Sequence, residues 1–168
     1  MNYHNIKHDD MNNGDGIRVV LWVAGCDHHC KGCQNQQTWD YNSGIEFDDE
    51  AKKELIEALS KPYIKGLTLS GGDPLCAADN NFFFFLCDLK RQFPDKDIWL
   101  YSGYTIEEIL KDNNVLKSNI LLLCDVLVDG RYIEKKRDIT LKWRGSSNQR
   151  VIDIQKTIAQ KKIVLYCD

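Results

Sequence analysis

Three cysteines stand close together in the segment GCDHHCKGCQN, at Cys26, Cys30 and Cys33. This spacing would bring three thiolates to one metal centre. A tetrahedral zinc ion or an iron-sulfur cube normally takes four protein ligands. A set of three cysteines therefore leaves one metal position open for a substrate, a water molecule or a fourth residue.

Two kinds of metal centre fit these ligands. Thiolate sulfur suits iron, and an iron-sulfur cube held at three corners would keep its fourth iron open as a Lewis acid that a small molecule can chelate. The alternative is a structural zinc ion held by the three cysteines together with His28 or His29. The spacing favours the iron-sulfur cluster and leaves zinc open as the alternative. If neither histidine is a ligand, we expect both side chains to be solvated, with tuning of the cluster or contact with a partner as the alternative.

The other four cysteines have no metal-ligand spacing: Cys76, Cys87, Cys124 and Cys167. Free cysteine usually behaves as a small buried hydrophobic residue. The chain has seven cysteines, an odd number, and their scattered positions do not resemble the paired framework of a small secreted domain. We therefore expect a reducing cytoplasmic location. Cys76 is distinctive because one residue separates it from the turn Gly71-Gly72-Asp73-Pro74.

That turn is the second candidate site. Its two glycines would let the backbone approach a ligand closely. The alternative is an ordinary turn in which Asp73 caps a helix. A third candidate is Asp129-Gly130-Arg131, which offers a carboxylate and a guanidinium group but would look the same in an ordinary turn.

Each candidate follows a predicted strand. Residues 18–24 form a β-branched and aromatic run between two glycines, which predicts a buried strand that ends at the cysteine loop. A second predicted strand, 66–70, ends at the Gly-Gly turn. Further strands are predicted at 97–102, 124–128, 150–154 and 163–166, and helices at 50–60, 80–93 and 105–111. We expect the phenylalanine-rich block of the second helix to pack in the core.

Strand and helix alternate through most of the chain, which predicts an α/β fold with right-handed crossovers and a parallel sheet. In such folds ligands bind at the carboxyl ends of the strands. We therefore expect the cysteine loop, the Gly-Gly turn and Asp129 to share one edge of the sheet. The 168 residues fit a single domain, 1–168, and are too few for an eight-stranded barrel, which takes about 250.

The composition argues against two classes of function. The chain is 43% hydrophobic and 28% charged with a formal net charge of -3, which argues against nucleic-acid binding by bulk charge. The N-terminal segment is polar, and no apolar run approaches the length of a membrane span. We therefore expect a soluble protein without a leader or a membrane segment.

The motif Gly14-x-Gly16-x-Arg18, followed by Gly25-Cys26-x3-Cys30-x2-Cys33-x-Asn35, resembles the signature of radical S-adenosylmethionine activating enzymes, which generate glycyl radicals in partner enzymes. The resemblance extends over almost the whole chain to the branch of this family that activates anaerobic ribonucleoside-triphosphate reductase. The matching stretches are Gln36-x-Thr38-Trp39, Gly71-Gly72-Asp73-Pro74, Asp97-Ile98-Trp99, Ser102-Gly103-Tyr104, Val128-Asp129-Gly130 and Trp143-Arg144-Gly145-Ser146-Ser147-Asn148-Gln149. Two positions depart from the family pattern: Trp22 stands where Phe is usual, and Gln34 where Tyr is most frequent.

The resemblance implies a partial, open (βα) barrel of about five or six mostly parallel strands. It implies that Cys26, Cys30 and Cys33 hold one 4Fe-4S cluster, through which they are catalytic, and that the amino and carboxylate groups of S-adenosylmethionine chelate the open iron. One electron from a low-potential donor such as flavodoxin would cleave the sulfonium bond. The resulting 5'-deoxyadenosyl radical would abstract a hydrogen atom from a glycine of the reductase large subunit.

The resemblance also implies which residues contact S-adenosylmethionine. They are Gly32, Cys33, Gln34, Gly71, Gly72, Asp73, Asp129 and Arg131. Carbonyl groups of the Gly-Gly turn would accept from the ammonium group, Asp129 would hydrogen-bond the ribose, and Arg131 would reach the carboxylate. The polar segment around Trp143 and Arg144 lies outside the cofactor signatures and would suit either docking of the partner or capping of the last strand.

Other functions stay open at this point. The chain would also suit an activase of another glycyl radical enzyme, such as pyruvate formate-lyase. A small iron-sulfur electron carrier would need a fourth local cysteine, and none follows Cys33 until Cys76. A zinc-supported interaction module is the third alternative.

Overall fold

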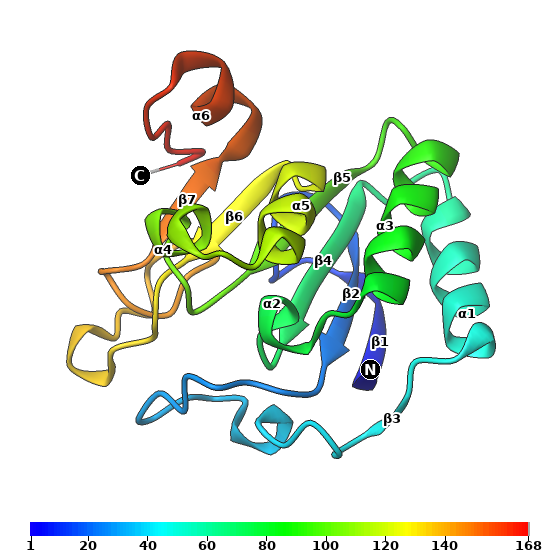
Figure 1. Cartoon of the computed structure of the whole chain (residues 1–168), viewed down its shortest axis with the longest axis horizontal. Coiled ribbons are helices and arrows are strands. Elements are labelled where there is room, and N and C mark those ends of the chain that lie inside the picture. The colour runs from blue at the N-terminus through cyan, green and yellow to red at the C-terminus, as the bar shows by residue number, and fades with distance from the viewer. Residues whose placement is uncertain (168) are drawn as a thin grey trace.

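The strands expected around the candidate residues join into one mixed sheet in the computed structural model, which describes residues 1–167 (Figure 1). Within these residues the sheet has seven strands in the order β3-β1-β2-β4-β5-β6-β7. The strands are β1 (Asn2–Asp10), β2 (Arg18–Val23), β3 (Ile45–Glu46), β4 (Gly66–Gly71), β5 (Asp97–Tyr101), β6 (Val126–Asp129) and β7 (Arg150–Asp153). The α-helices are α1 (Asp49–Ser60), α2 (Pro74–Ala77), α3 (Asn80–Gln92), α4 (Ile106–Lys111), α5 (Val115–Leu123) and α6 (Ile154–Gln160), and the 3-10 helices are η1 (Gln36–Thr38) and η2 (Glu134–Lys136).

Four neighbouring strands, β2, β4, β5 and β6, pair in parallel and confirm the predicted parallel sheet. The expected number of five or six strands is too low. In the described part of the chain, β1, β3 and β7 add antiparallel strands beside this core. The sheet is therefore mixed and open, with β3 and β7 at its edges, and the curvature of a partial barrel stays a prediction.

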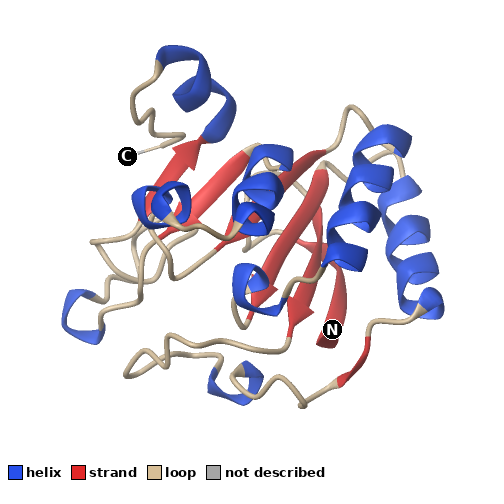
Figure 2. Ribbon diagram, viewed as in Figure 1, coloured by secondary structure: helices blue, strands red, loops and turns tan. Residues whose placement is uncertain are grey.

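The side chains of the parallel strands alternate between two faces of the sheet. On one face, Val19, Leu21 and Val23 of β2 belong to the main hydrophobic core, which also contains side chains of the helices from α1 to α5. Figure 2 shows α2, α3, α4 and α5 in front of the sheet on this side. The opposite face carries a smaller buried cluster, made of Trp99, Val126, Val128 and Val151. Among residues 1–167, no helix contributes a side chain to this second cluster, so a ligand site can form on this face at the carboxyl edge.

Several elements are not predicted by the sequence, β1 and α5 among them, and the predicted strand 163–166 is wrong. β1 has two buried apolar side chains, Tyr3 and Ile6, which are too few to give an alternating pattern. The apolar residues of α5 are consecutive at its end, so they lack helical periodicity. The predicted strand 163–166 is instead a loop that meets β7 through a single bridge between Ile152 and Leu165, which is too short a contact for a strand.

The predicted helices form, and side chains cap their first turns. The Asp48 carboxylate accepts from the amide of Ala51 at the start of α1, and Thr105 heads a capping box at the start of α4. In α3, Phe82 and Phe85 are buried, which confirms the expected core packing at these positions, whereas Phe84 is 62% exposed, so the expectation is wrong there. Among the helices of residues 1–167, each is too short or too polar to cross a membrane.

Candidate functional site

A cavity of about 580 Å³ opens at the carboxyl ends of the parallel strands, on the face opposite the helices. Its lining includes two cross-strand pairs, Trp22 with Ser70 and Tyr101 with Val128. The three cysteines of the loop after β2 also line it. A cavity of this size suits a small-molecule ligand, and it lies at the edge of the sheet where the sequence predicts binding.

The cysteine loop is held by backbone hydrogen bonds at its base and near its end. The Gly25 amide donates to the Thr38 carbonyl of η1 at 2.8 Å, and the Cys33 amide donates to the Cys30 carbonyl at 3.0 Å. Cys26 is buried, whereas Cys30 and Cys33 are half-buried. All three cysteines are among the residues that line the same cavity.

Both loop histidines have contacts other than the cysteines. The Nε2 atom of His28 lies 2.7 Å from Oδ2 of Asp73. His29 is exposed, and its ring centroid lies 4.7 Å from that of Trp39. Within residues 1–167 the other cysteines lie outside the cavity lining. The donor set therefore fits a group that takes three thiolates and keeps one position open, which favours a 4Fe-4S cluster over a four-coordinate zinc ion.

Burial affects the charge state of the first ligand. Desolvation raises the pKa of the Cys26 thiol to about 12, because the negative thiolate loses water contacts there. A metal-bound cysteine is a thiolate, so binding of a cationic metal centre releases this proton and offsets the desolvation.

The Gly-Gly turn after β4 lies directly against the cysteine loop. The Gly72 amide donates to the Val23 carbonyl and the Asp73 amide to the Gly25 carbonyl, each at 2.8 Å. Gly71 has φ +102, and a Cβ at Gly72 would overlap the Gly25 carbonyl. The two glycines are therefore required by a close approach between the turn and the loop that carries the cysteines.

Asp73 joins the turn to three other parts of the chain. Its side chain is 1% exposed. Oδ1 accepts from the Leu75 amide at 2.9 Å and so caps α2, as the ordinary-turn alternative predicts. Oδ2 accepts from Ser102 Oγ at 2.9 Å and from the Gly103 amide at 2.8 Å, and it faces His28 as well. This carboxylate is thus fully hydrogen-bonded inside the protein.

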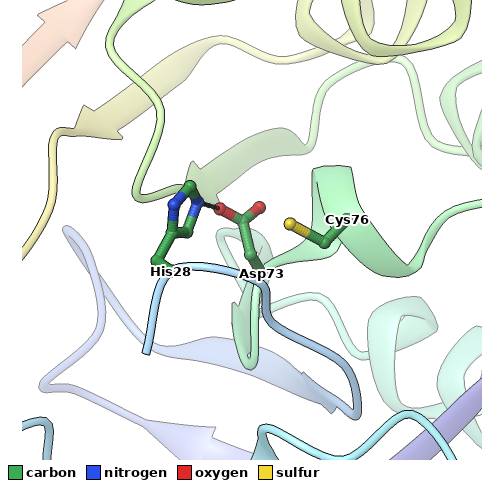
Figure 3. A group of neighbouring side chains, drawn as sticks. All are labelled: His28, Asp73 and Cys76. Atoms are coloured by element: carbon green, nitrogen blue, oxygen red, sulfur yellow. Dashed lines mark hydrogen bonds and ion pairs between the residues drawn. The ribbon is translucent and has the colours of Figure 1, made fainter. Parts of the chain in front are cut away.

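His28, Asp73 and Cys76 lie together, with one possible ligand atom of each within 4.8 Å of the others (Figure 3). Such a group could in principle hold a metal ion, but the acceptor sites of Asp73 are already occupied by four donors. Burial alone would lower the pKa of His28, yet hydrogen bonds with Asp73 and Cys76 outweigh it and raise the pKa to about 9. The trio is a hydrogen-bonded junction beside the cysteine loop.

The structure does not bring Asp129 or Arg131 into the cavity lining. Oδ2 of Asp129 accepts from the Ile106 amide at 2.9 Å, and Oδ1 accepts from Nε of Arg150 at 3.0 Å. Arg131 is exposed and pairs with Glu108 at 3.0 Å. Both side chains are engaged elsewhere, so the contacts with S-adenosylmethionine expected of them lack support from their positions.

Gln34 and Gly32 lie beside the last cysteine of the loop. Gln34 lines the main cavity and also an adjoining hollow, and Gly32 lines that hollow. Gly32 has φ +75, and a Cβ there would press on the Glu134 side chain. The loop conformation therefore explains Gly32, while Gln34 is positioned to contact a ligand.

Arg144 and Trp143 line the cavity as well, although sequence reasoning assigned their segment to docking or to strand capping. Nη1 of Arg144 donates to the Gln149 carbonyl at 3.1 Å. Its Nε is buried without a partner among the described residues. Trp143 packs edge to face on Trp99, with ring centroids 4.9 Å apart. No local pattern predicts this inward placement, because it depends on how the segment before β7 folds back across the sheet.

Similarity to known proteins agrees with the cysteine site. Residues 12–152 match a family model described as "4Fe-4S single cluster domain". The chain is 43% identical over 152 residues to the anaerobic ribonucleoside-triphosphate reductase-activating protein of Haemophilus influenzae, covering 89% of this chain and 96% of that protein. Proteins of the same name from Enterobacteria phage T4 and Escherichia coli K12 are 47% identical over 152 residues and 40% identical over 154 residues. These two alignments each cover 90% of this chain, with 93% of the phage protein and 97% of the Escherichia coli protein. The chain belongs to the family of anaerobic ribonucleoside-triphosphate reductase-activating proteins, with a 4Fe-4S single cluster domain.

Proposed function

We propose that this protein is a radical S-adenosylmethionine enzyme that installs a glycyl radical on the large subunit of anaerobic ribonucleoside-triphosphate reductase. The observation that carries the proposal is the meeting of three cysteines and the Gly-Gly turn in one cavity, with both loop histidines engaged elsewhere. The relatives, which are named as activating proteins of that reductase, supply the partner.

Cys26, Cys30 and Cys33 would hold the 4Fe-4S cluster and leave one iron open. The cluster, when bound and reduced by a low-potential donor such as flavodoxin, would supply the electron that cleaves S-adenosylmethionine to methionine and a 5'-deoxyadenosyl radical. The chain itself holds the thiols on one wall of the cavity and places the Gly-Gly turn next to them. We place this activity in the cytoplasm, where thiols stay reduced.

The amino-acid end of S-adenosylmethionine would contact the turn and one arginine. Backbone carbonyls at Gly71 and Gly72 would accept from the ammonium group. Arg144 lines the cavity, and its guanidinium group has further N–H donors beside the Nη1 that binds the Gln149 carbonyl, so it would donate to the carboxylate. We prefer Arg144 to Arg131 for this role because Arg144 lines the cavity, whereas Arg131 does not and pairs with Glu108. Asp73 would support the turn from inside the protein.

The glycine of the partner must reach the same cavity. The segment that follows η2 borders the opening, and Ile139, which is 83% exposed, lies in the lining of both the cavity and the adjoining hollow. Arg144 is half-buried by contrast. We therefore assign docking contacts to the exposed part of this segment around Ile139.

Anaerobic reconstitution with iron and sulfide tests the proposed function. We expect a brown protein with about four irons per chain that, after chemical reduction, converts S-adenosylmethionine to 5'-deoxyadenosine and methionine. A brown protein that releases no 5'-deoxyadenosine would indicate an electron carrier. A colourless protein that binds zinc would indicate an interaction module, and either result would contradict the proposal.

Two matched cysteine variants make this test specific. Cys30→Ser removes one of the proposed ligands and should abolish both cluster retention and 5'-deoxyadenosine release. Cys87→Ser changes a half-buried cysteine of α3 outside the cavity lining and should leave both unchanged. Retention of a stable cluster in Cys30→Ser would rule out the three-cysteine site.

A further inference from the structure

The cysteine loop has one deeply buried side chain between its first two ligands. The side chain of His28 is 5% exposed, whereas Asp27 and His29 on either side are exposed. Asp27 accepts from the Tyr41 hydroxyl, and His29 stacks on Trp39. His28 is therefore the side chain that anchors this part of the loop in the protein interior.

The ends of β4 and β5 build the environment of the His28 ring. Its Nε2 lies 2.7 Å from Oδ2 of Asp73, as Figure 3 shows, and its ring meets that of Tyr104 edge to face with centroids 4.5 Å apart. A Cβ at Gly103 would overlap the ring. Gly103 does not have a positive φ, so the closeness of His28 explains the glycine at this position.

The partner of His28 is itself fixed. Asp73 is held by Ser102, Gly103 and the cap of α2, and its own amide donates to the Gly25 carbonyl. The Gly-Gly turn immediately precedes Asp73. A hydrogen bond between His28 and Asp73 therefore ties the loop between the first two cysteines to the turn.

From this geometry we propose that His28 is a positioning residue, which holds the proposed cluster at the correct distance from the turn that would bind the amino-acid end of S-adenosylmethionine. The inference rests on the proposed function and adds a role for a residue at an unspecified position between the first two cysteines of the motif. Cluster assembly needs three thiols, and these remain when His28 is removed. S-adenosylmethionine must contact the cluster and the turn together, so its binding depends on their spacing.

The test compares His28→Ala, His28→Gln and the neighbouring control His29→Ala after anaerobic reconstitution. Three quantities are measured: iron per chain, the Kd of S-adenosylmethionine by equilibrium dialysis, and the cofactor-induced change in the electron paramagnetic resonance spectrum of the reduced cluster. We expect all variants to keep their iron and His28→Ala to bind S-adenosylmethionine about 10-fold or more weakly. His28→Gln should recover most of the affinity, because its amide can donate to Asp73, and His29→Ala should match the wild-type protein.

A double-mutant cycle with Gly103 isolates the contact. Gly103→Ala should displace the His28 ring and weaken S-adenosylmethionine binding to a similar extent. When His28→Ala is already present, adding Gly103→Ala should reduce the affinity for S-adenosylmethionine only slightly, since the ring that the new methyl group would displace is absent. If the losses of S-adenosylmethionine binding free energy in the two single variants add up in the double variant, the two residues act independently and the proposal is overturned.

Further outcomes separate this inference from the proposed function. Wild-type affinity in His28→Ala would overturn the role of His28 and leave the proposed function intact. Loss of iron in His28→Ala to the level of Cys30→Ser would also overturn it, because His28 would then serve cluster assembly. If the wild-type protein holds a cluster but binds no S-adenosylmethionine, the proposed function fails and this inference fails with it.

Discussion

Asp73 accepts four hydrogen bonds within the protein, and only one of them can be anticipated from nearby sequence. The bond from Leu75 is a helix cap two residues away, which the Asp-Pro turn predicts. The bonds with Ser102 and His28 span 29 and 45 residues. Residue types and spacing therefore predict the cysteines and the glycines of the site, whereas the partners of Asp73 follow from the pairing of β2, β4 and β5.

Two arginines can be distinguished at the residue scale. Arg144→Ala should weaken S-adenosylmethionine binding about 10-fold, because it removes a charged donor from the cavity lining. Arg131→Ala removes an exposed partner of Glu108 and should change the affinity by less than about 2-fold. Equilibrium dialysis on the reconstituted variants measures both. The reverse order of effects would restore Arg131 as the carboxylate ligand.

At the scale of elements, α4 is tied to β6 and β7 by one charged network. Arg150 of β7 donates to Asp129 at the end of β6 and, at 2.7 Å, to Glu107 of α4. Asp129 also accepts from the first amide of α4. The sequence predicts these three elements. The family resemblance implies a ligand role for Asp129, whereas the residues alone leave an ordinary turn open, because a strand-end aspartate looks the same in both roles.

This network predicts a pH-dependent contribution to stability. Hydrogen bonds from Arg150 hold the pKa of Glu107 at about 2, below its ordinary value of 4.5. A lowered pKa stabilises the fold above about pH 4.5, and this contribution is lost as the pH falls toward about 2. Glu107→Gln should therefore lower the free energy of unfolding by about 0.5–1 kcal/mol at pH 7, a modest amount because Glu107 is half exposed to solvent.

Urea unfolding of the cluster-free protein at pH 7 and at about pH 3 measures this effect. The difference in the free energy of unfolding between the wild-type protein and Glu107→Gln should be less than half as large at about pH 3 as at pH 7. Glu57→Gln, on the exposed side of α1, serves as the control and should show no such dependence. A difference that stays constant over this range would contradict the role of the ion pair.

At the scale of the whole molecule, an open sheet leaves one face of its carboxyl edge for chemistry. The sequence predicts the parallel core because β2, β4, β5 and β6 are short apolar runs closed by glycine or aspartate turns. It does not predict β1, where polar residues dominate, or the inward path of the segment before β7. The cavity combines predicted strand ends with this unpredicted segment, so its lining is visible only in the folded chain.

The proposed installation of a glycyl radical on the anaerobic reductase can be observed in the reductase itself. The most direct measurement is the electron paramagnetic resonance spectrum of the reductase large subunit after anaerobic incubation with the reduced, reconstituted protein and S-adenosylmethionine. We expect the doublet of a glycyl radical, absent when Cys30→Ser replaces the wild-type protein. No doublet on the reductase, or a doublet that forms on pyruvate formate-lyase instead, would overturn the proposed function.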